Sequence, residues 1–585
     1  MKEQQHSGKV YKVNGPIIEA IIFEDLMMLE VVYVGPKKII GEVIKLYRDK
    51  CIIQVYEDTT MIKPDDFVYR TNNLLNVILG PGLLSSIFDG IQRPLTFLFN
   101  NSKQPFISAG EKLFPLNTDK LWHFKPIIKN NSFVKSGEII GVVDETEKIQ
   151  HKIMVPNFLE GEIINIKSEG NYKITDTIAQ LKTKTKIVDL KLYQQWSVRS
   201  PRPYLKKDNE IEPLLTGQRV IDTLFPVKKG GVVMIPGGFG TGKTMTQQAI
   251  AKWCNADIIV YIGCGERGNE MADVLKEFEH LFDYKNNKPL IERTIIIANT
   301  SNMPVAARET SIYTGITIAE YYRDMGYDVA LMADSTSRWA EALRELSARM
   351  EEIPAEESYP AYLASYLAKF YERAGKVVNL NSTKGSITII GAVSPQGGDF
   401  SEPVTQQTKR FTKVFWALDK QLANERHYPA INWINSYSEY ADEIVNWYNK
   451  HINDEFGKLR QEIINILAEN EKLQQVVKLV GADVLPDNQR LIIETVDLFK
   501  NIFLQQNAYD AIDMYSVIRK QFLMLKIIIR YYEKAKLFIN QGHTLLEVKR
   551  LPVYNTILKM KFSISNNELE KFENIILEID KQISV

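Results

Sequence analysis

The sequence contains few cysteines and no excess of charge of either sign. Its 585 residues include only Cys51, Cys254 and Cys264, which cannot build a disulfide scaffold and lack zinc-ligand spacing. Lys and Arg number 72, and so do Asp and Glu, so the formal net charge is zero. Because proteins that hold nucleic acid on a broad basic face usually carry a basic excess, we expect no nucleic-acid partner.

Long apolar runs are also missing. No stretch approaches the roughly 18–20 apolar residues that a membrane helix needs. The start, MKEQQHSGKV, is polar and shows no secretory signal. We therefore expect a cytoplasmic protein whose membrane association, if it has one, is peripheral. The content of 45% hydrophobic and 25% charged residues is that of a globular protein, and the length predicts about three to five domains.

The pattern along the chain predicts four regions. Residues 1–72 contain short runs rich in Ile, Val and Tyr between turn formers, which predicts a β-barrel. Residues 105–195 are a second strand-rich block, for which an independent β domain acting as a spacer is the simplest interpretation. Between 205 and 435, apolar strands alternate with helical stretches, as in an α/β domain with a parallel sheet.

The last region, 436–585, predicts a helical bundle. Apolar residues recur there at steps of three and four, as in Phe456, Leu459, Ile463 and Leu467, and again in Leu569, Phe572, Ile576 and Ile579. Bundle core is the simpler interpretation of these stripes, and a partner surface is the alternative. The predicted fold class is therefore multi-domain, with an N-terminal β-barrel, a β-rich insertion, a central α/β domain and a C-terminal helical domain.

The strongest motif is a phosphate-binding loop. The run GGFGTGKT fits G-x-x-x-x-G-K-[ST], with a strand, VVMI, before it and a helix, TMTQQAIAKW, after it. Glycines let the backbone approach a pyrophosphate, and the N–H groups of the helix start then face the anion. The candidate nucleotide-binding residues are Gly237, Gly238, Phe239, Gly240, Thr241, Gly242, Lys243 and Thr244. Lys243 adds charge near the β- and γ-phosphates, and the Thr244 hydroxyl can bind Mg²⁺. The alternative is a glycine-rich turn before a helix.

A second motif ends the apolar strand DVALMAD at Asp334. A carboxylate at the carboxyl end of a strand is the arrangement of a Walker B element, which holds Mg²⁺ through its water shell. Because many strands end in Asp, this motif alone is weak evidence for a Walker B element. The phosphate loop upstream supports that interpretation.

A third motif, GCGERGNE, directly follows the strand DIIVYI. Strand ends of a parallel sheet face the ligand crevice. Glu266 is therefore placed to orient or deprotonate a water that attacks the γ-phosphate, and Arg267 to contact phosphate oxygens. The alternative, a Glu–Arg loop on the surface, fits the spacing equally well. His151 and His427 have no partner at ligand spacing, so we interpret them as structural or surface residues.

Several long motifs together identify a resemblance. In chain order they are GGFGTGKT, YIGCGERGNEM, DSTSRWAEALRE, GAVSPQGGDFSEPVT, FWALDKQLANERHYPAINW and FLQQNAYDAIDMYS. These motifs closely resemble those of the catalytic A subunits of V/A-type rotary ATPases, and the likeness covers essentially the whole chain. The block at 105–195 resembles the "bulge" insertion of these subunits, and the length resembles that of the prokaryotic ones.

The resemblance implies a site for ATP or ADP with Mg²⁺. It implies that Glu266 is the catalytic glutamate, that Lys243, Thr244 and Arg267 bind phosphates and Mg²⁺, and that Asp334 lies behind the metal. Tyr428 and Tyr509 occupy positions of the aromatic adenine pocket where relatives usually carry Phe. Stacking on adenine survives that change.

The resemblance also implies partners. The chain would alternate with a homologous B subunit in a hexameric ring around a central shaft, with peripheral stalk subunits and, indirectly, a membrane sector. An arginine finger would come from the B subunit, and the assembly would lie on the cytoplasmic face of a membrane. The sequence departs from relatives at Gly238, Thr241 and Gln396, and none of these changes touches a catalytic role.

Three other functions compete with this interpretation. A non-catalytic ring subunit typically lacks the intact GKT loop and the glutamate, so Lys243 and Glu266 count against it. A Rho-type RNA translocase needs a basic, aromatic RNA-binding groove, which the zero net charge disfavours. A secretion-apparatus ATPase is a nearer relative, but its family lacks the insertion.

Overall fold

The computed structural model describes residues 7–102, 109–111, 113–283, 288–481 and 484–583. Its contacts divide the chain into two units, and both are discontinuous in sequence. Unit 1 consists of Met1–Glu210, Lys229–Met234 and Ala256–Thr412, and unit 2 of Ile211–Lys228, Ile235–Asn255 and Lys413–Val585. The predicted multi-domain fold, with an N-terminal barrel, a central α/β region and a helical C-terminal region, is confirmed.

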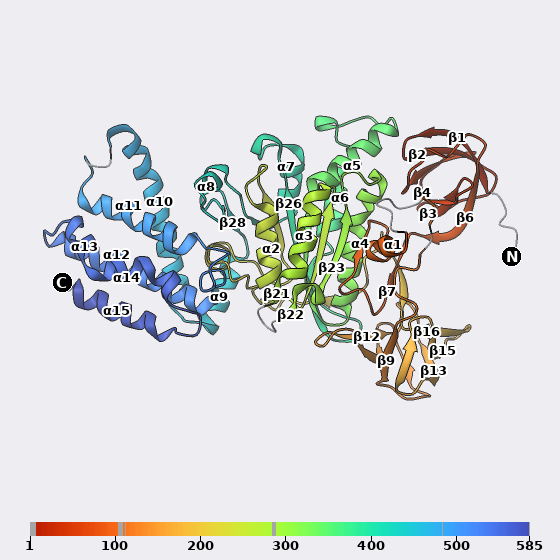
Figure 1. Ribbon diagram of the computed structural model, residues 1–585, viewed down its shortest axis with the longest axis horizontal. Helices are drawn as coiled ribbons and strands as arrows, with labels where there is room; N and C mark the ends of the chain where they lie inside the picture. Colours follow the sequence, from red (N-terminus) through yellow and green to blue (C-terminus); the bar gives the residue numbers. More distant parts are fainter. Residues whose placement is uncertain (1–6, 103–108, 112, 284–287, 482–483, 584–585) are drawn as a thin grey trace. The chain divides into compact units, whose positions relative to one another are not determined.

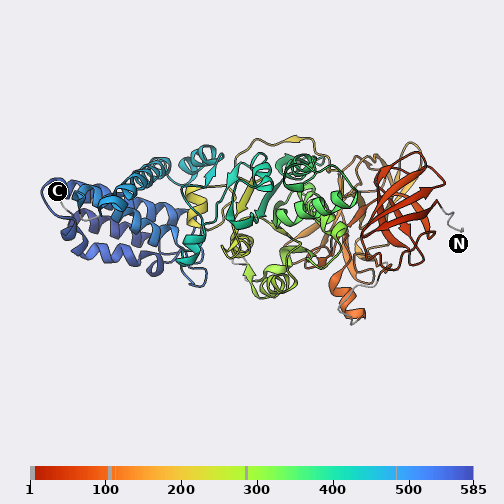
Figure 2. The ribbon, with the colours of Figure 1, turned by 90° about the horizontal axis from the view of Figure 1, so that it is seen from above.

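Unit 1 begins with a closed six-stranded barrel of strand order β1-β2-β5-β4-β3-β6 (Figures 1 and 2). Its strands are β1 (Gly8–Asn14), β2 (Ile17–Ile22), β3 (Glu30–Val34), β4 (Ile39–Leu46), β5 (Lys50–Val55) and β6 (Phe67–Leu74). Val32, Val43 and Ile53 are fully buried in its core. Apolar side chains of these strands therefore fill the barrel interior, and the β-barrel that the sequence predicts is confirmed.

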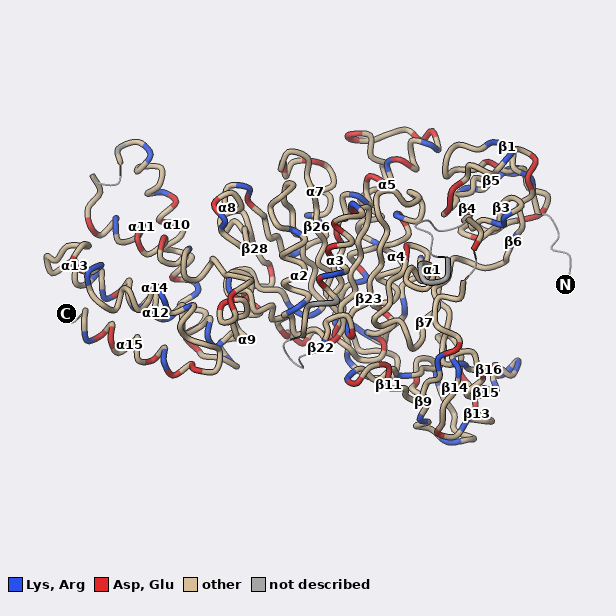
Figure 3. The backbone as a smooth tube through the Cα atoms, in the orientation of Figure 1, with Lys and Arg blue, Asp and Glu red and all other residues tan. Residues whose placement is uncertain are grey.

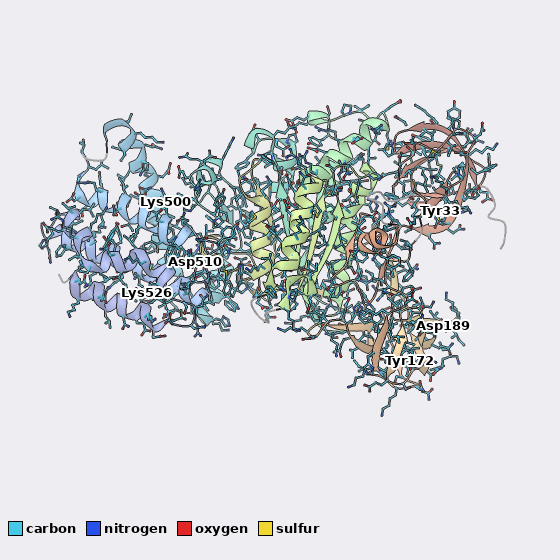
Figure 4. All side chains as sticks on the ribbon, in the orientation of Figure 1. Tyr33, Tyr172, Asp189, Lys500, Asp510 and Lys526 are labelled. Carbon is cyan, nitrogen blue, oxygen red and sulfur yellow. The ribbon has the colours of Figure 1, made fainter. Side chains whose placement is uncertain are left out.

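The insertion consists of two four-stranded sheets, ordered β10-β13-β15-β16 and β12-β11-β9-β14. The strands are β9 (Leu121–Pro126), β10 (Phe133–Val134), β11 (Ile139–Asp144), β12 (Gln150–Met154), β13 (Gly161–Ile166), β14 (Gly170–Lys173), β15 (Thr177–Lys182) and β16 (Ile187–Lys191). Tyr172 and Asp189 lie on this insertion (Figure 4), and the Tyr172 ring packs edge-on against Phe124. Because β7 (Asn76–Leu79) pairs with β17 (Gln194–Ser197), the chain leaves and re-enters the insertion along adjacent strands.

A buried sheet forms the centre of unit 1, with β19, β26, β24, β20, β23 and β8 in that order. Its strands are β8 (Ile87–Phe88), β19 (Val232–Pro236), β20 (Ile258–Cys264), β23 (Thr294–Asn299), β24 (Asp328–Asp334) and β26 (Lys384–Val393), with β25 (Gly375–Val378) and β18 (Lys206–Lys207) added beside β26. The pairs from β26 to β8 are parallel, as expected for an α/β domain. Every residue of β20 is buried, which explains its unbroken apolar run.

Helices accompany this sheet. They are α1 (Leu95–Ser102), α3 (Gly268–His280), α4 (Val305–Asp324), α5 (Thr336–Arg349), α6 (Leu363–Tyr371) and α7 (Pro403–Lys409), with short 3₁₀ turns at Leu290–Arg293, Glu356–Ser358 and Gln396–Gly398 and a small hairpin of β21 (Phe282–Asp283) and β22 (Lys288–Pro289). Residues 80–95, which contain several Gly and Pro residues, have the composition of a loop that leads into a helix. The helix α1 is present, but Ile87 and Phe88 also pair with Ile296 and Ile297 as a strand of the main sheet.

Unit 2 is mainly helical. Its elements are α2 (Lys243–Trp253), α8 (Lys420–Asn424), α9 (Ala441–His451), α10 (Phe456–Val480), α11 (Asp487–Phe499), α12 (Ile518–Asn540), α13 (Leu545–Arg550), α14 (Pro552–Ser563) and α15 (Glu570–Gln582), a π-helical turn at each of Val220–Leu224 and Lys500–Leu504, and a hairpin of β27 (Val414–Phe415) and β28 (Tyr437–Ser438). Phe456, Ile463, Phe572 and Ile579 are fully buried, so the predicted stripes do form core.

The distribution of charged residues and the hydropathy of the helices are as expected from the balanced composition. Cations and anions are interspersed along both units (Figure 3). Within the described ranges, no helix combines the length and the apolar character needed to span a bilayer.

Candidate functional site

In unit 2, the phosphate loop joins the end of β19 at Pro236 to the start of α2 at Lys243. Gly240 and Gly242 have φ of +79° and +88°, a left-handed conformation that side chains disfavour. Gly237 is required for a different reason, because a Cβ there would lie 2.5 Å from the Thr241 hydroxyl oxygen. The glycines of the motif therefore set both the curvature and the close packing of the loop.

Two side chains brace this loop from within. The Lys243 ammonium donates to the carbonyl oxygens of Gly237 at 2.7 Å and Gly238 at 3.0 Å. The Thr241 hydroxyl donates to the Gly238 carbonyl at 2.8 Å. The positive charge of Lys243 is thus held over the loop, where a phosphate chain would replace the carbonyl contacts. Phe239, by contrast, is 79% exposed at the tip of the loop.

The two predicted adenine-pocket tyrosines lie in the same unit. A Cβ on Gly242 would stand 3.4 Å from Cε1 of Tyr428, so this ring borders the loop. The backbone N–H of Gln506 donates to the Tyr428 carbonyl at 2.8 Å, which brings the segment containing Tyr509 beside it. Tyr428 is 42% and Tyr509 88% exposed, so both rings offer free surface for stacking.

In unit 1, adjacent strands bring two predicted acids together. Glu266 follows β20 and Asp334 ends β24, and these strands are parallel neighbours in which Gly263 lies opposite Asp334. The Tyr261 hydroxyl donates to an Asp334 carboxylate oxygen at 3.1 Å, and Asp334 is only 2% exposed. Both acids therefore lie at the carboxyl edge of the sheet, where such sheets place ligands.

Burial and acidic neighbours change the titration of Glu266. Burial, the Asp334 carboxylate and a hydrogen bond with Glu270 raise the pKa of Glu266 to about 8, while Arg338 opposes the rise. Sequence reasoning missed Glu270 and Arg338. Glu270 comes four residues after Glu266, a helical spacing that could have pointed to it.

The remaining cations are near the same loop. Arg267 caps the start of α3 and is exposed. Arg308, which sequence reasoning also missed, packs against Gly265, where an added Cβ would lie 2.9 Å from its Cδ. Arg308 also donates to the Ser301 carbonyl at 2.9 Å. The loop that carries Glu266 is therefore flanked by positive charge suited to phosphate oxygens.

The described residues contain no cluster of three or more His, Cys, Asp or Glu side chains able to hold a metal ion. Thr244 supplies a hydroxyl and Asp334 a carboxylate, which are the hard oxygen donors that Mg²⁺ prefers. Because Mg²⁺ keeps several waters and is usually shared with substrate phosphates, each of these oxygen donors has the chemistry for an ion that a nucleotide brings.

Four family profiles match the chain. They are described as "ATP synthase alpha/beta family, beta-barrel domain" over residues 10–72, "ATPsynthase alpha/beta subunit barrel-sandwich domain" over 113–199, "ATP synthase alpha/beta family, nucleotide-binding domain" over 217–438 and "C-terminal domain of V and A type ATP synthase" over 445–548. The nucleotide-binding match contains the phosphate loop, Glu266, Asp334 and Tyr428.

Individual proteins match over nearly the whole chain. The A subunit of the A-type ATP synthase of Methanopyrus kandleri is 52% identical over 98% of this chain and 98% of its own length. The V-type ATP synthase alpha chain of Halothermothrix orenii has the same identity and coverage. Among solved structures, the assembled ATPase EscN of the enteropathogenic E. coli type III secretion system aligns with a TM-score of 0.62 over 89% of this chain and 100% of that one. At 22% identity, this structural alignment shows a shared fold alone.

Proposed function

Because the chain belongs to the family of A subunits of A-type and V-type ATP synthases, we propose how its residues perform the catalysis of these subunits. The protein is the catalytic subunit of a rotary ATPase, which hydrolyses or synthesises ATP, and it binds nucleotide. Rotation and the transport of ions across a membrane follow from the family. The observation that carries the proposal for this chain is the position of Glu266 beside Asp334 at the carboxyl edge of the sheet.

The phosphate loop binds the triphosphate. Its backbone N–H groups and the start of α2 face the phosphates, and Lys243 exchanges its carbonyl contacts for the β- and γ-phosphate oxygens. The Thr244 hydroxyl would bind Mg²⁺ directly, and the Asp334 carboxylate would hold it through water. When bound, the ion neutralises charge that develops on the phosphoryl oxygens. Arg267 contributes a further positive charge to the same oxygens.

Glu266 orients the attacking water and accepts its proton. This role requires the ionised carboxylate, and Arg338 is the neighbour that favours ionisation. A carboxyl group with a raised pKa is also a stronger base once ionised, which suits proton transfer near neutral pH. Tyr428 and Tyr509 stack on the adenine ring, since both present exposed aromatic faces.

The active assembly is a hexameric ring in which this chain alternates with a homologous B subunit. The B subunit supplies an arginine finger, and a central shaft and peripheral stalks connect the ring to a membrane sector on the cytoplasmic face. Nucleic acid has no part in this function. The exposure of Phe239, Tyr428 and Tyr509 supports a nucleotide site that a partner subunit completes.

ATP turnover with and without the partner tests this proposal. The isolated chain should bind ATP but hydrolyse it slowly, and addition of a B subunit should raise kcat by about a thousandfold or more, the order expected for an arginine finger. Co-purification should recover the ring and the shaft. Full activity of the purified monomer would overturn the requirement for a partner.

A further inference from the structure

A cavity of about 910 Å³ lies within unit 1. Its walls come from the barrel, the segment 199–207 and helices α4, α5 and α6. Figure 1 labels these helices and strands of the barrel. Glu266 and Asp334 are not among the described residues that line it, and neither is any part of the phosphate loop. Small-molecule sites commonly have volumes of about 300–1,000 Å³. The cavity therefore has the size of a ligand site that is separate from the nucleotide site.

Part of the wall is aromatic. Tyr362, directly before α6, and Tyr366 of α6 have ring centroids 5.0 Å apart, with their planes at an angle of 40°. Tyr313 of α4 also lines the cavity, under the Arg199 guanidinium at 4.7 Å. Leu346 of α5 adds an aliphatic surface. Such walls favour a flat, mostly apolar body, because tyrosine faces pack against rings.

Another part of the wall is basic, near the end of α6. Arg373 is neutralised by Glu320, to which it donates at 2.6 and 3.0 Å. Lys369 lies one helical turn earlier, and Lys207 is brought close by the pairing of its strand with Val377. Lys207 and Lys369 are both exposed, and no described carboxylate forms an ion pair with either of them. Positive charge at this end therefore attracts an anion.

Arg202 adds a buried donor to the same end. It is 2% exposed, and its guanidinium packs on the rings of Trp196 at 5.0 Å and Tyr321 at 5.3 Å. Its Nε donates to Asp324 at 2.6 Å, but its Nη1 finds no acceptor among the described residues. An unsatisfied buried donor is costly, and an acceptor oxygen on a ligand would remove that cost.

We propose that this cavity is a second ligand site, which binds a planar organic anion. The ring of the ligand packs among Tyr313, Tyr362 and Tyr366. Its carboxylate, sulfonate or phosphate group faces Arg202, Lys207 and Lys369. Because the barrel and α4–α6 all contribute walls, a bound ligand holds the barrel against these helices and stabilises unit 1.

The probe 1-anilinonaphthalene-8-sulfonate, a planar aromatic anion, tests the proposal. The full chain, with its phosphate loop saturated by ADP, should bind one equivalent of the probe with a rise in fluorescence. The double variant Lys207→Glu/Lys369→Glu changes two exposed residues and should retain the fold. It should raise the Kd of the probe at least tenfold. Leu346→Trp, which fills the cavity, should abolish binding.

The matched control is Lys135→Glu/Lys559→Glu, which reverses the charge of two exposed lysines outside the cavity and should leave the Kd unchanged. An unchanged Kd in the Lys207→Glu/Lys369→Glu variant would overturn the proposal. So would displacement of the probe by ADP with one-to-one stoichiometry, because the probe would then occupy the nucleotide site.

Discussion

At Glu266, replacing one carboxylate oxygen with an amide nitrogen removes a base and keeps the shape. We expect Glu266→Gln to lower ATP hydrolysis by the reconstituted ring at least a hundredfold, as when a positioned general base is lost. Nucleotide affinity should change little, because the phosphate loop is intact. Steady-state turnover and nucleotide titration measure the two effects. Glu147→Gln, an exposed acid of the insertion, is the control. Near-normal turnover of Glu266→Gln would reject the catalytic role.

His427 makes the stability of unit 2 depend on pH. Burial, together with the charges of Lys561 and Lys500, lowers the pKa of His427 to about 4, and its Nε2 has no described partner. Between pH 4 and about 6.5 the unfolded chain therefore binds a proton that the folded chain excludes. Above pH 6.5 this residue does not lower the free energy of unfolding. As the pH falls from 6.5 toward 4, the free energy of unfolding decreases by about 3 kcal/mol because of His427.

Urea unfolding of the wild type and His427→Gln at pH 7.5 and 5.0 measures this effect. The wild type should lose more stability than the variant between the two pH values. His451→Gln, a change at an exposed histidine of α9 in the same unit, should behave like the wild type. Equal losses in the wild type and His427→Gln would contradict the assigned pKa.

At the scale of elements, a buried polar cluster fastens the insertion to α4. Glu145, after β11, accepts from His151 at 2.7 Å and from the Tyr322 hydroxyl at 2.9 Å. The Tyr321 hydroxyl contacts the other His151 nitrogen at 2.9 Å. The opposite Glu145 oxygen accepts from the backbone N–H of Gly82. The burial of Glu145, His151 and both tyrosines excludes water as a substitute partner.

We expect Glu145→Ala to lower the free energy of unfolding of unit 1 by about 3 kcal/mol, because several buried donors lose their acceptor together. Urea unfolding followed by tryptophan fluorescence measures the loss. Glu147→Ala, two residues away and 74% exposed in its side chain, should change stability by less than about 0.5 kcal/mol. Similar losses in the two variants would mean that the cluster does not fasten the insertion.

The sequence predicts those elements whose signal is local. The strand before the phosphate loop, the helix after it and the buried β20 are visible as apolar runs with the right neighbours. β8 is not visible, because its two residues become a strand only by pairing with β23, about two hundred residues later. The predicted apolar stripes of the C-terminal helices have the correct period, but the buried positions differ from them by one residue in places. Ile466 and Ile575 are more buried than the predicted Leu467 and Ile576.

At the candidate site, too, only residues with a local sequence signal can be predicted. The positions of Glu266 and Asp334 can be predicted because each lies at the carboxyl end of a recognisable strand. The cluster around them cannot, since Arg338 acts on Glu266 from α5 and Tyr261 reaches Asp334 from the neighbouring strand. His151 gives no local signal either, because Tyr321, one of its two partners, lies on α4, 170 residues away. Its other partner, Glu145, is six residues away but is not at a helical or strand spacing that would point to it. Side-chain contacts between distant segments need the fold before they can be inferred.

At the scale of the whole molecule, an early segment is part of the C-terminal helical unit. Arg219 is fully buried, donates to Asp513 at 2.6 Å and also binds the Phe503 carbonyl. The Tyr448 hydroxyl donates to the Asp222 carbonyl at 3.0 Å. Arg460 donates to the Thr223 carbonyl at 2.9 Å. The helices of unit 2 are therefore assembled around residues 211–228.

Excision tests this dependence. Residues 413–585 alone should unfold without a sharp transition, because Asp513 is left buried without its cation at a cost of about 3–5 kcal/mol. A chain that joins residues 211–255 to 413–585 should recover cooperative unfolding, followed by circular dichroism in urea. A sharp transition in the shorter fragment, at the urea midpoint of the longer one, would show that the early segment is dispensable.

The interleaving of the two units has a consequence during synthesis on the ribosome. The first pieces of unit 2 are complete at Asn255, but their helical partners extend to α15, which ends at Gln582. At the usual elongation rate of about 5–20 residues per second, the early pieces wait roughly 16 to 65 s for those partners. Throughout that interval the apolar and charged surfaces around Arg219 are open to wrong partners, so newly made chains should depend on chaperones that shield nascent polypeptides.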